Sequence, residues 1–210
     1  HGVFRRQRQM CIRDRILSDD IYEHVKFDNF KFFTIAQIKK LKDRTLTMNG
    51  VSKAYAMTGW RIGYAAGPKN IIAAIRKIQS QSTSNPSSIS QAAAVEALNG
   101  TQSFIKKRAK SFSDRRNFVV NYLNSIPGIT CLMPKGAFYV FPSCKGLIGK
   151  KTKIKNDTDF VQKLLEKQNV AVVQGSAFGL DGYFRISYAT SMKKLKIAMQ
   201  RIKLFCESLG

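Results

Sequence analysis

The chain has 210 residues, 44% of them hydrophobic, and its 36 lysines and arginines outnumber 13 acidic residues to give a net charge of +23. This length can bury one large or two small hydrophobic cores. No apolar run approaches the roughly 20 residues that span a membrane. The start also lacks the apolar core of a signal peptide, so we expect a cytoplasmic protein without membrane contact.

The cysteine and histidine content argues against a disulfide framework, a histidine-based metal site and a histidine triad. The cysteines are Cys11, Cys131, Cys144 and Cys206. They show no paired ligand spacing, and we expect reduced thiols. The only histidines are His1 and His24. The sequence therefore predicts no metal site and leaves cofactor chemistry as the more natural function.

The first fifteen residues differ in composition from the rest of the chain. They contain five arginines and no lysine, whereas the remainder strongly prefers lysine. They show neither clear periodicity nor a transit-peptide profile. We interpret residues 1–15 as a non-native scar of translated adapter sequence, with a genuine basic arm as the alternative.

The segments up to residue 99 alternate between strand and helix patterns. The predicted strands are residues 16–22 (a strand end running into a turn), 45–48 and 60–66, with a turn at Asn49-Gly50. The predicted helices are residues 68–78 and 90–98, with a break at 84–86. This order is typical of an α/β domain with a mostly parallel sheet.

The second half reads as a smaller domain reached by a long helix from Thr101 to Asn124. The further strands predicted are residues 129–133, 137–141, 170–173 and 183–189, and the further helices run from an Asp157 cap to Gln168 and from a Ser191 cap to Ser208. We expect a solvated loop at residues 146–155 and another loop at residues 175–179. For Phe138 and Tyr139 we expect core packing, since aromatic runs are usually core.

A lysine and an arginine flank the start of the 60–66 strand. Lys53 follows the 45–48 strand, and Arg61 follows Lys53 eight residues later. A lysine amine forms a Schiff base with an aldehyde, and a planar guanidinium holds a phosphate by its fork. Pyridoxal 5'-phosphate carries both groups. The alternative is an exposed lysine and arginine beside a β-hairpin.

The string Ser-Lys-x-x-x-Met-Thr-Gly-Trp-Arg-x-Gly-Tyr over residues 52–64 resembles the cofactor-lysine motif of the aspartate-aminotransferase family, the class I/II aminotransferases of fold type I. The resemblance covers residues 16–210 and implies the C-terminal half of a longer polypeptide. It implies that residues 16–99 are the C-terminal part of the cofactor-binding large domain, with its mostly parallel sheet. Residues 100–210 would be the small α+β C-terminal domain.

The resemblance also implies a role for five residues. Lys53 is the catalytic lysine and holds the cofactor aldehyde. Asp19 meets the pyridine nitrogen, Tyr22 meets the phenolic oxygen and Arg61 anchors the phosphate. Arg185 grips the substrate α-carboxylate. The plainer alternatives are that Asp19 belongs to a solvated turn pair, and that Arg185 lies on the wet face of its strand or pairs with an acid.

Two further positions matter to the resemblance. Residues 81–83 lie where the family has its dimer interface, near the partner's cofactor phosphate, although an ordinary helix break explains them equally well. Gln174 stands where the family usually has proline, which we expect to loosen the following loop without displacing Arg185.

The activity implied is transfer of an amino group from an L-amino acid, aspartate-like or aromatic, to a 2-oxo acid in a ping-pong cycle. A homodimer with a shared active site is implied as well, and we expect the 210-residue chain alone to be inactive. The alternatives are a pyridoxal-phosphate lyase of the same fold and, less favoured, a nucleic-acid-binding protein. The latter would use basic blocks at residues 39–42, 106–108 and 150–153.

Overall fold

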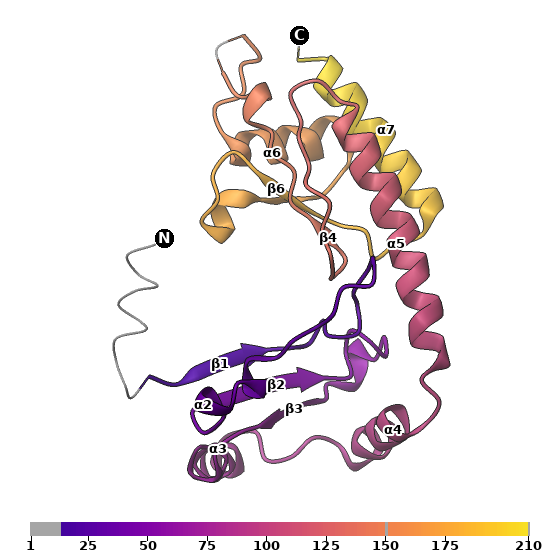
Figure 1. Cartoon of the computed structure of the whole chain (residues 1–210). Coiled ribbons are helices and arrows are strands. Elements are labelled where there is room, and N and C mark those ends of the chain that lie inside the picture. Colours follow the sequence, from indigo (N-terminus) through magenta and orange to yellow (C-terminus); the bar gives the residue numbers. More distant parts are fainter. Residues whose placement is uncertain (1–13, 150, 210) are drawn as a thin grey trace. The chain divides into compact units, whose positions relative to one another are not determined.

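The computed structural model describes residues 14–149 and 151–209 and divides into two compact units (Figure 1). The first unit ends at Ile105 and the second begins at Lys106. The predicted domain boundary, between residues 99 and 100, lies a few residues before this division. We interpret residues 1–15 as a scar, and residues 1–13 of that segment lie outside the described residues.

The first unit contains a three-stranded sheet in the order β1-β2-β3. The strands are β1 (Ile16–Asp19), β2 (Thr45–Gly50) and β3 (Gly63–Ala66). β1 and β2 are parallel, and the connection between them carries the 3-10 helix η1 (Ile35–Gln37) and the short helix α2 (Lys39–Lys42). β2 and β3 are antiparallel. Among the described strands the sheet is therefore mixed and not mostly parallel, because residues 51–62 contain no crossover helix.

The predicted turn at Asn49-Gly50 is wrong, because both residues belong to β2. Asn49 pairs with Tyr64, and its side chain accepts a hydrogen bond from the Gly50 N–H (2.8 Å) and donates one to Glu23 (2.7 Å). Gly50 lets the chain approach closely, since a Cβ there would lie 2.9 Å from the Ile62 carbonyl oxygen. Glycine in this strand marks a close backbone contact and not a reversal of the chain.

The strand predicted at residues 60–66 is shorter than expected. Thr58–Trp60 forms the 3-10 helix η2, and β3 begins only at Gly63. Between them Arg61 has left-handed backbone angles, with φ 53°. This unusual residue turns the chain from η2 into β3.

Two helices follow, α3 (Lys69–Ser82) and α4 (Ser88–Asn99), and both extend beyond the predicted ranges. No residue of α3 is buried, and in α4 only Ala94 is. Ile75 and Ile78 on α3 are exposed although their spacing is that of an apolar helix face. The first unit therefore leaves apolar surface of α3 uncovered.

The second unit begins within the long helix α5 (Ser103–Asn124), close to the predicted range. Its sheet has the order β4-β6-β5, with both pairings antiparallel. The remaining elements are β4 (Tyr139–Val140), the 3-10 helix η3 (Lys145–Leu147), α6 (Asp157–Gln168), β5 (Val173–Gln174), the 3-10 helix η4 (Gly175–Phe178), β6 (Phe184–Ser187) and α7 (Met192–Glu207). Phe160 of α6 lies at the centre of the core, with its ring centroid 5.0 Å from that of Phe184 and 5.3 Å from that of Phe205.

The strand predicted at residues 129–133 is wrong. Only Thr130 forms a bridge there, with Ser143. The Asn124 side chain instead accepts from the Cys131 N–H (2.7 Å) and donates to the Cys131 carbonyl (2.9 Å). A side chain thus satisfies the backbone groups that a strand partner would otherwise take. The strands predicted at 137–141 and 170–173 are likewise shorter or shifted, to β4 and β5.

One of the two predicted helix caps is confirmed. The Ser191 hydroxyl accepts from the Lys194 N–H (3.3 Å) and caps α7. The cap of α6 is Asn156 and not Asp157, because the Asn156 side chain accepts from the Asp159 N–H (2.9 Å). Asp157 is the first helical residue, and its carboxylate is engaged elsewhere.

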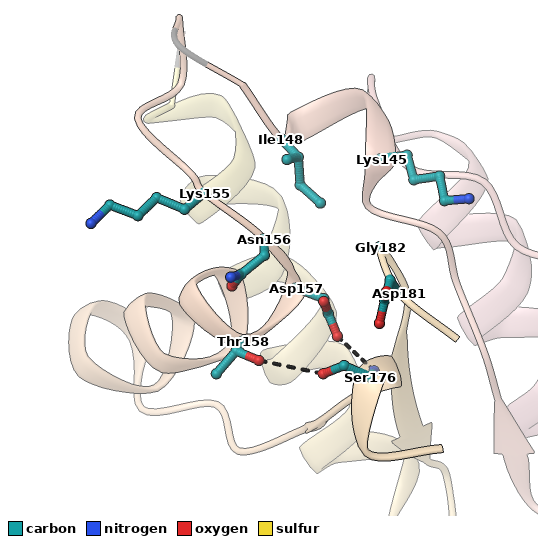
Figure 2. Close-up of a pocket in the computed structure, with 9 residues that line it drawn as sticks. All are labelled: Lys145, Ile148, Lys155, Asn156, Asp157, Thr158, Ser176, Asp181 and Gly182. Atoms are coloured by element: carbon teal, nitrogen blue, oxygen red, sulfur yellow. Dashed lines mark hydrogen bonds between the residues drawn. The ribbon is translucent and has the colours of Figure 1, made fainter. Parts of the chain in front are cut away.

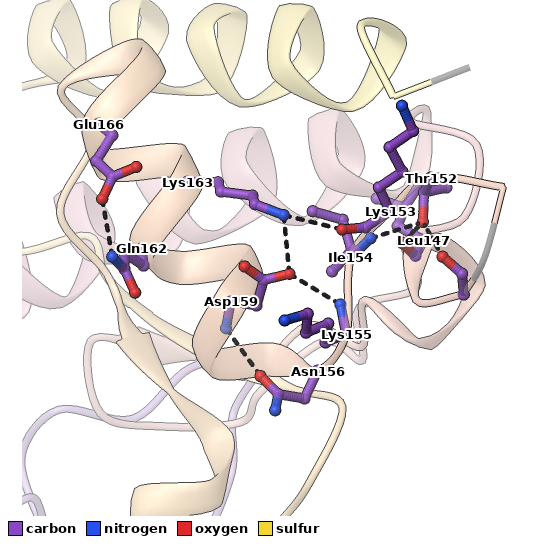
Figure 3. A network of polar contacts seen from close by, with 11 residues as sticks. Leu147, Thr152, Lys153, Ile154, Lys155, Asn156, Asp159, Gln162, Lys163 and Glu166 are labelled. Carbon is purple, nitrogen blue, oxygen red and sulfur yellow. Dashed lines mark hydrogen bonds and ion pairs between the residues drawn. The ribbon is translucent and has the colours of Figure 1, made fainter.

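The segment at residues 146–155 is more structured than the predicted solvated loop. Leu147 and Ile154 are buried, and Ile154 bridges to Gly149. Figure 3 shows how α6 holds this segment: Asp159 accepts from the Lys155 N–H (2.9 Å) and pairs with Lys163 (3.0 Å). Lys163 also donates to the Lys153 carbonyl (2.8 Å).

Arg116 of α5 is buried, with 2% of its surface exposed. Its Nη1 donates to the Pro134 carbonyl (2.9 Å), and its Nη2 donates to the Asn117 side chain (2.8 Å). The arginine therefore holds the segment that leads into β4.

Among the described residues, no helix is both long enough and apolar enough to cross a membrane.

Candidate functional site

Four of the five predicted site residues come to one edge of the sheet in the first unit. Asp19 ends β1, and Tyr22 lies in the turn that follows. Lys53 lies in the turn just after β2, the parallel neighbour of β1. Arg61 precedes β3, which runs antiparallel to β2 and so starts at the edge where β2 ends. The carboxyl ends of parallel strands are where α/β sheets commonly bind ligands.

The two neighbouring acids at the end of β1 differ in environment. Asp19 is exposed, and its Oδ1 accepts from the Ile21 N–H (3.2 Å). Asp20 is 6% exposed and accepts from the Ser18 hydroxyl (2.7 Å). The idea of a solvated pair is therefore wrong for Asp20. Asp19 also lines a cavity of about 510 Å³, whose other lining residues include Asn49, Tyr64 and Arg76.

Backbone turns hold Tyr22 and Lys53 in place. The Tyr22 carbonyl accepts from the Val25 N–H (2.9 Å), and the Lys53 carbonyl accepts from the Ala56 N–H (3.3 Å). Both residues are half-buried. Tyr22 and Lys53 thus each lie in a hydrogen-bonded turn that follows a strand.

Arg61 is held by local contacts. Its Nη1 donates to the Thr58 carbonyl (2.9 Å), and the residue is exposed. The next residue, Ile62, is buried in a cluster with Val51 and Ala94. This anchor fixes the backbone on both sides of the Lys53 turn while leaving the guanidinium at the surface.

Arg185 lies in the second unit, in the middle of β6. The residues on either side of it, Phe184 and Ile186, are buried, and Arg185 is half-buried, which confirms the predicted alternation. Its guanidinium carbon lies 4.6 Å from the ring centroid of Tyr139 and 4.4 Å from that of Phe178. Within residues 14–149 and 151–209, no carboxylate forms an ion pair with Arg185. Neither a fully exposed strand face nor an acidic partner therefore explains why an arginine stands at this position of β6.

Sequence reasoning missed the contacts around Arg185. The run around Phe138 and Tyr139 was predicted as core, and Phe138 does stack on Phe112 with a centroid distance of 5.6 Å. Tyr139, however, lies against Arg185. Alternation within the run places successive side chains on opposite faces, but it does not identify which face meets an arginine.

Asp157 has a contact that sequence reasoning did not predict, since Asp157 was expected to cap its helix. It is 2% exposed, and its carboxylate accepts from the Ser176 N–H (2.8 Å), as Figure 2 shows. Burial acts to raise the pKa of Asp157, but hydrogen bonds from the Ser176 amide and hydroxyl and from the Gly182 amide outweigh it and lower the pKa. The Asn156-x-x-Asp159 spacing was the signal that could have identified the true cap.

Most of the basic-block residues that the structure describes are exposed, whereas Arg108 is half-buried. Lys39, Lys40 and Lys42 on α2 are exposed, and so are Lys106 and Lys107 at the start of the second unit. They occupy separate elements, as predicted for the solvated faces of a lysine-rich protein.

Comparison with known proteins gives a consistent result. The model of the family "Aminotransferase class I and II" matches residues 13–202. The aspartate aminotransferase of Rhizobium meliloti (strain 1021) is 59% identical over 200 residues, which are 93% of this chain and 49% of that protein. A probable aspartate/prephenate aminotransferase of Rickettsia typhi is 58% identical over 199 residues, covering 92% of this chain and 50% of the relative. The chain thus spans about half the length of the relatives it matches.

Solved structures agree with these relatives. The crystal structure of the Rhizobium meliloti aspartate aminotransferase superposes with a TM-score of 0.89 at 59% identity, over 92% of this chain and 50% of that one. An aromatic aminotransferase from Pyrococcus horikoshii OT3 gives 0.85 at 38% identity, over 92% and 51%. These neighbours have fold type I, and class I/II aminotransferases of the aspartate aminotransferase type use pyridoxal phosphate. The resemblance drawn from residues 52–64 is confirmed: the chain belongs to the class I and II aminotransferases.

Proposed function

We propose that the native gene product containing this chain is a pyridoxal-phosphate-dependent aminotransferase. It would transfer an amino group from an L-amino acid, aspartate-like or aromatic, to a 2-oxo acid in a ping-pong cycle. The observation that supports this most is the gathering of Asp19, Tyr22, Lys53 and Arg61 at one sheet edge. The names of the relatives support aspartate as the first donor to test.

The side chains at that edge fit the cofactor by their chemistry. A lysine amine matches an aldehyde, a carboxylate matches a pyridinium nitrogen, a tyrosine hydroxyl matches a phenolic oxygen and a guanidinium matches a phosphate. When bound, the cofactor supplies an electron-poor ring that accepts electron density from the substrate Cα.

Each residue then has one task. Lys53 would hold the cofactor through its amine, and this amine would serve as general base and acid for the α-proton of the substrate. The Asp19 carboxylate would hold a proton at the ring nitrogen, and the Tyr22 hydroxyl would donate to the phenolic oxygen. Arg61 binds the phosphate. Arg185 binds the α-carboxylate by its fork, which orients the Cα–H bond.

We further propose that this chain is the C-terminal part of a longer polypeptide that forms a homodimer in the cytoplasm. Three observations support the larger assembly. The chain spans about half the length of its relatives. The unit with the partly parallel sheet precedes the unit whose sheet is antiparallel, and α3 leaves Ile75 and Ile78 exposed. A native gene product that is no longer than this chain, measured by intact mass, would contradict this part of the proposal.

Borohydride trapping tests the lysine assignment. Reduction of the loaded native gene product should attach the cofactor to the peptide that contains Lys53, with mass spectrometry as the readout. The Lys53→Ala variant should lose this adduct and all turnover while still binding some cofactor noncovalently. The Lys69→Ala variant, which changes an exposed lysine of α3, should behave like the wild type. An adduct on another lysine, or turnover by Lys53→Ala at the wild-type rate, would refute the assignment.

The lyase alternative is not favoured, because the relatives are named aminotransferases. Two substrates separate the two activities: L-aspartate for transamination, and L-cystathionine, which carries a thiol leaving group on Cβ, for β-elimination. Transamination of L-aspartate leaves the aminated cofactor and one equivalent of 2-oxo acid, whereas a β-lyase hydrolyses L-cystathionine to homocysteine, ammonia and pyruvate. Ammonia released in step with substrate loss would overturn the aminotransferase proposal.

A further inference from the structure

The Arg185 guanidinium lies over two aromatic rings that come from different segments. Tyr139 belongs to β4, and Phe178 ends η4. Their centroids lie 4.6 Å and 4.4 Å from the guanidinium carbon. Aromatic faces attract a guanidinium, and a stacked guanidinium still donates hydrogen bonds within its own plane. The rings can therefore hold the cation while its N–H fork remains available to a carboxylate.

Both rings are fixed by contacts of their own. Tyr139 lies opposite Ser187 in the β4–β6 ladder. Phe178 meets the Phe141 ring edge to face, with a centroid distance of 5.6 Å. The backbone of η4 is tied to the start of β6 by a hydrogen bond from the Gly175 N–H to the Tyr183 carbonyl (2.7 Å).

Asp157 fixes η4 from the other side. Its buried carboxylate accepts from the Ser176 N–H, two residues before Phe178 (Figure 2). A hydrogen bond to an ionised acceptor is stronger than one between neutral groups. The contact therefore links the first residue of α6 to the turn that places the Phe178 ring.

We propose that Tyr139 and Phe178 are positioning residues that hold the Arg185 guanidinium ready for a substrate carboxylate, and that Asp157 keeps Phe178 in place through Ser176. The inference rests on the proposed function, in which Arg185 binds the α-carboxylate. A guanidinium already held in one orientation loses less side-chain freedom on binding. The rings would thus strengthen carboxylate binding without touching the reacting atoms.

The test uses the native gene product with two readouts. Binding of succinate, a dicarboxylate without an amine, is measured by calorimetry, and kcat and KM are measured with L-aspartate. Phe178→Leu and Tyr139→Leu should each raise the succinate Kd and the aspartate KM about tenfold, with kcat reduced less than about threefold. Phe178→Tyr and Tyr139→Phe keep an aromatic face and should stay within about twofold of wild type.

Asp157 has its own matched pair of variants. Asp157→Asn weakens the acceptor and should raise the succinate Kd about threefold. Asp181→Asn, which changes an exposed carboxylate lining the same pocket, is the matched control, and its Kd should match wild type. Phe178 is 47% exposed, so its leucine variant opens no buried cavity, and the Tm confirms that it folds. If Tyr139→Leu does not fold, Tyr139→Met replaces it.

The outcomes separate this proposal from the one it rests on. Wild type that binds succinate and transaminates, with Phe178→Leu unchanged in Kd and KM, would overturn the positioning roles and leave the function intact. If Phe178→Leu and Phe178→Tyr raise the succinate Kd and the aspartate KM equally, the aromatic contact is not what holds the guanidinium. Wild type that transaminates without binding succinate would overturn the positioning proposal alone. Wild type that does neither would overturn both proposals.

Discussion

Gly50 and Gly63 lie opposite each other in the antiparallel ladder of β2 and β3. Lys53 follows the first glycine by three residues, and Arg61 precedes the second by two. A Cβ on Gly50 would lie 2.9 Å from the Ile62 carbonyl oxygen, whereas one on Gly63 would come no closer than 3.4 Å to the Asn49 carbonyl oxygen. The pairing of these glycines therefore fixes the two ends of the segment that carries Lys53 and Arg61. The close approach of the strands requires glycine at position 50 but not at position 63.

Gly50→Ala should destabilise the first unit, because a Cβ would push against backbone that cannot move freely. We expect a loss of about 1–3 kcal/mol in the free energy of unfolding. Urea unfolding followed by the fluorescence of Trp60, the single tryptophan, measures it. Gly63→Ala is the matched control and should cost clearly less. Equal stability of the two variants would show that the close approach is unimportant.

Arg116→Met should destabilise the second unit. The substitution keeps much of the side-chain volume but leaves the Pro134 carbonyl without the 2.9 Å hydrogen bond from Nη1. An unsatisfied buried acceptor costs about 1–3 kcal/mol. Thermal unfolding followed by circular dichroism checks this. Arg115→Met, at the half-buried neighbour, should change the Tm less, and an unchanged Tm in Arg116→Met would contradict the structural role.

Asp157 should make stability depend on acid pH. Its pKa is lowered from the usual 3.8, so its stabilising contribution is present above pH 3.8 and is lost as the pH falls through the lower folded value. Urea unfolding midpoints between pH 2 and pH 7 measure the loss. Asp157→Asn should flatten the acid limb, whereas Asp114→Asn, at an exposed position of α5, should not. A steep acid limb retained in Asp157→Asn would assign the effect to other groups.

The buried cysteines should resist alkylation in the folded protein. Cys131, Cys144 and Cys206 are free and buried, and burial raises their pKa to about 11, 12 and 12. Because the thiolate is the reactive form, we expect little modification by iodoacetamide at pH 8. Peptide mass spectrometry should find full labelling only after denaturation. Rapid labelling of Cys144 in the native state would show that the second unit opens readily.

Local signals in the sequence predicted several elements well. The long α5, the Ser191 cap of α7 and the alternation around Arg185 follow from periodicity and from capping chemistry, which depend on near neighbours. The family followed from residues 52–64 for a similar reason, because a contiguous motif keeps its residue types and spacing together.

The errors arose where a group outside the segment decides the local structure. The Asn49-Gly50 pair is typical of a turn, yet β3 pairs with it and extends β2. Residues 129–133 have the pattern of a strand, yet the Asn124 side chain takes the backbone groups of Cys131. In both cases a hydrogen-bonding partner outside the segment, seven or more residues away, overrode the local preference.

The sequence by itself determined the family and the helix-rich order of the second unit, and it predicted five site residues. Only the tertiary structure decided that Asp19, Tyr22, Lys53 and Arg61 share one sheet edge, since strand pairing and direction set that edge. It also decided that the Arg185 guanidinium lies over the rings of Tyr139 and Phe178. The physical reason is that a spacing specifies neighbours along the chain, whereas stacking and strand register join residues that only folding brings together.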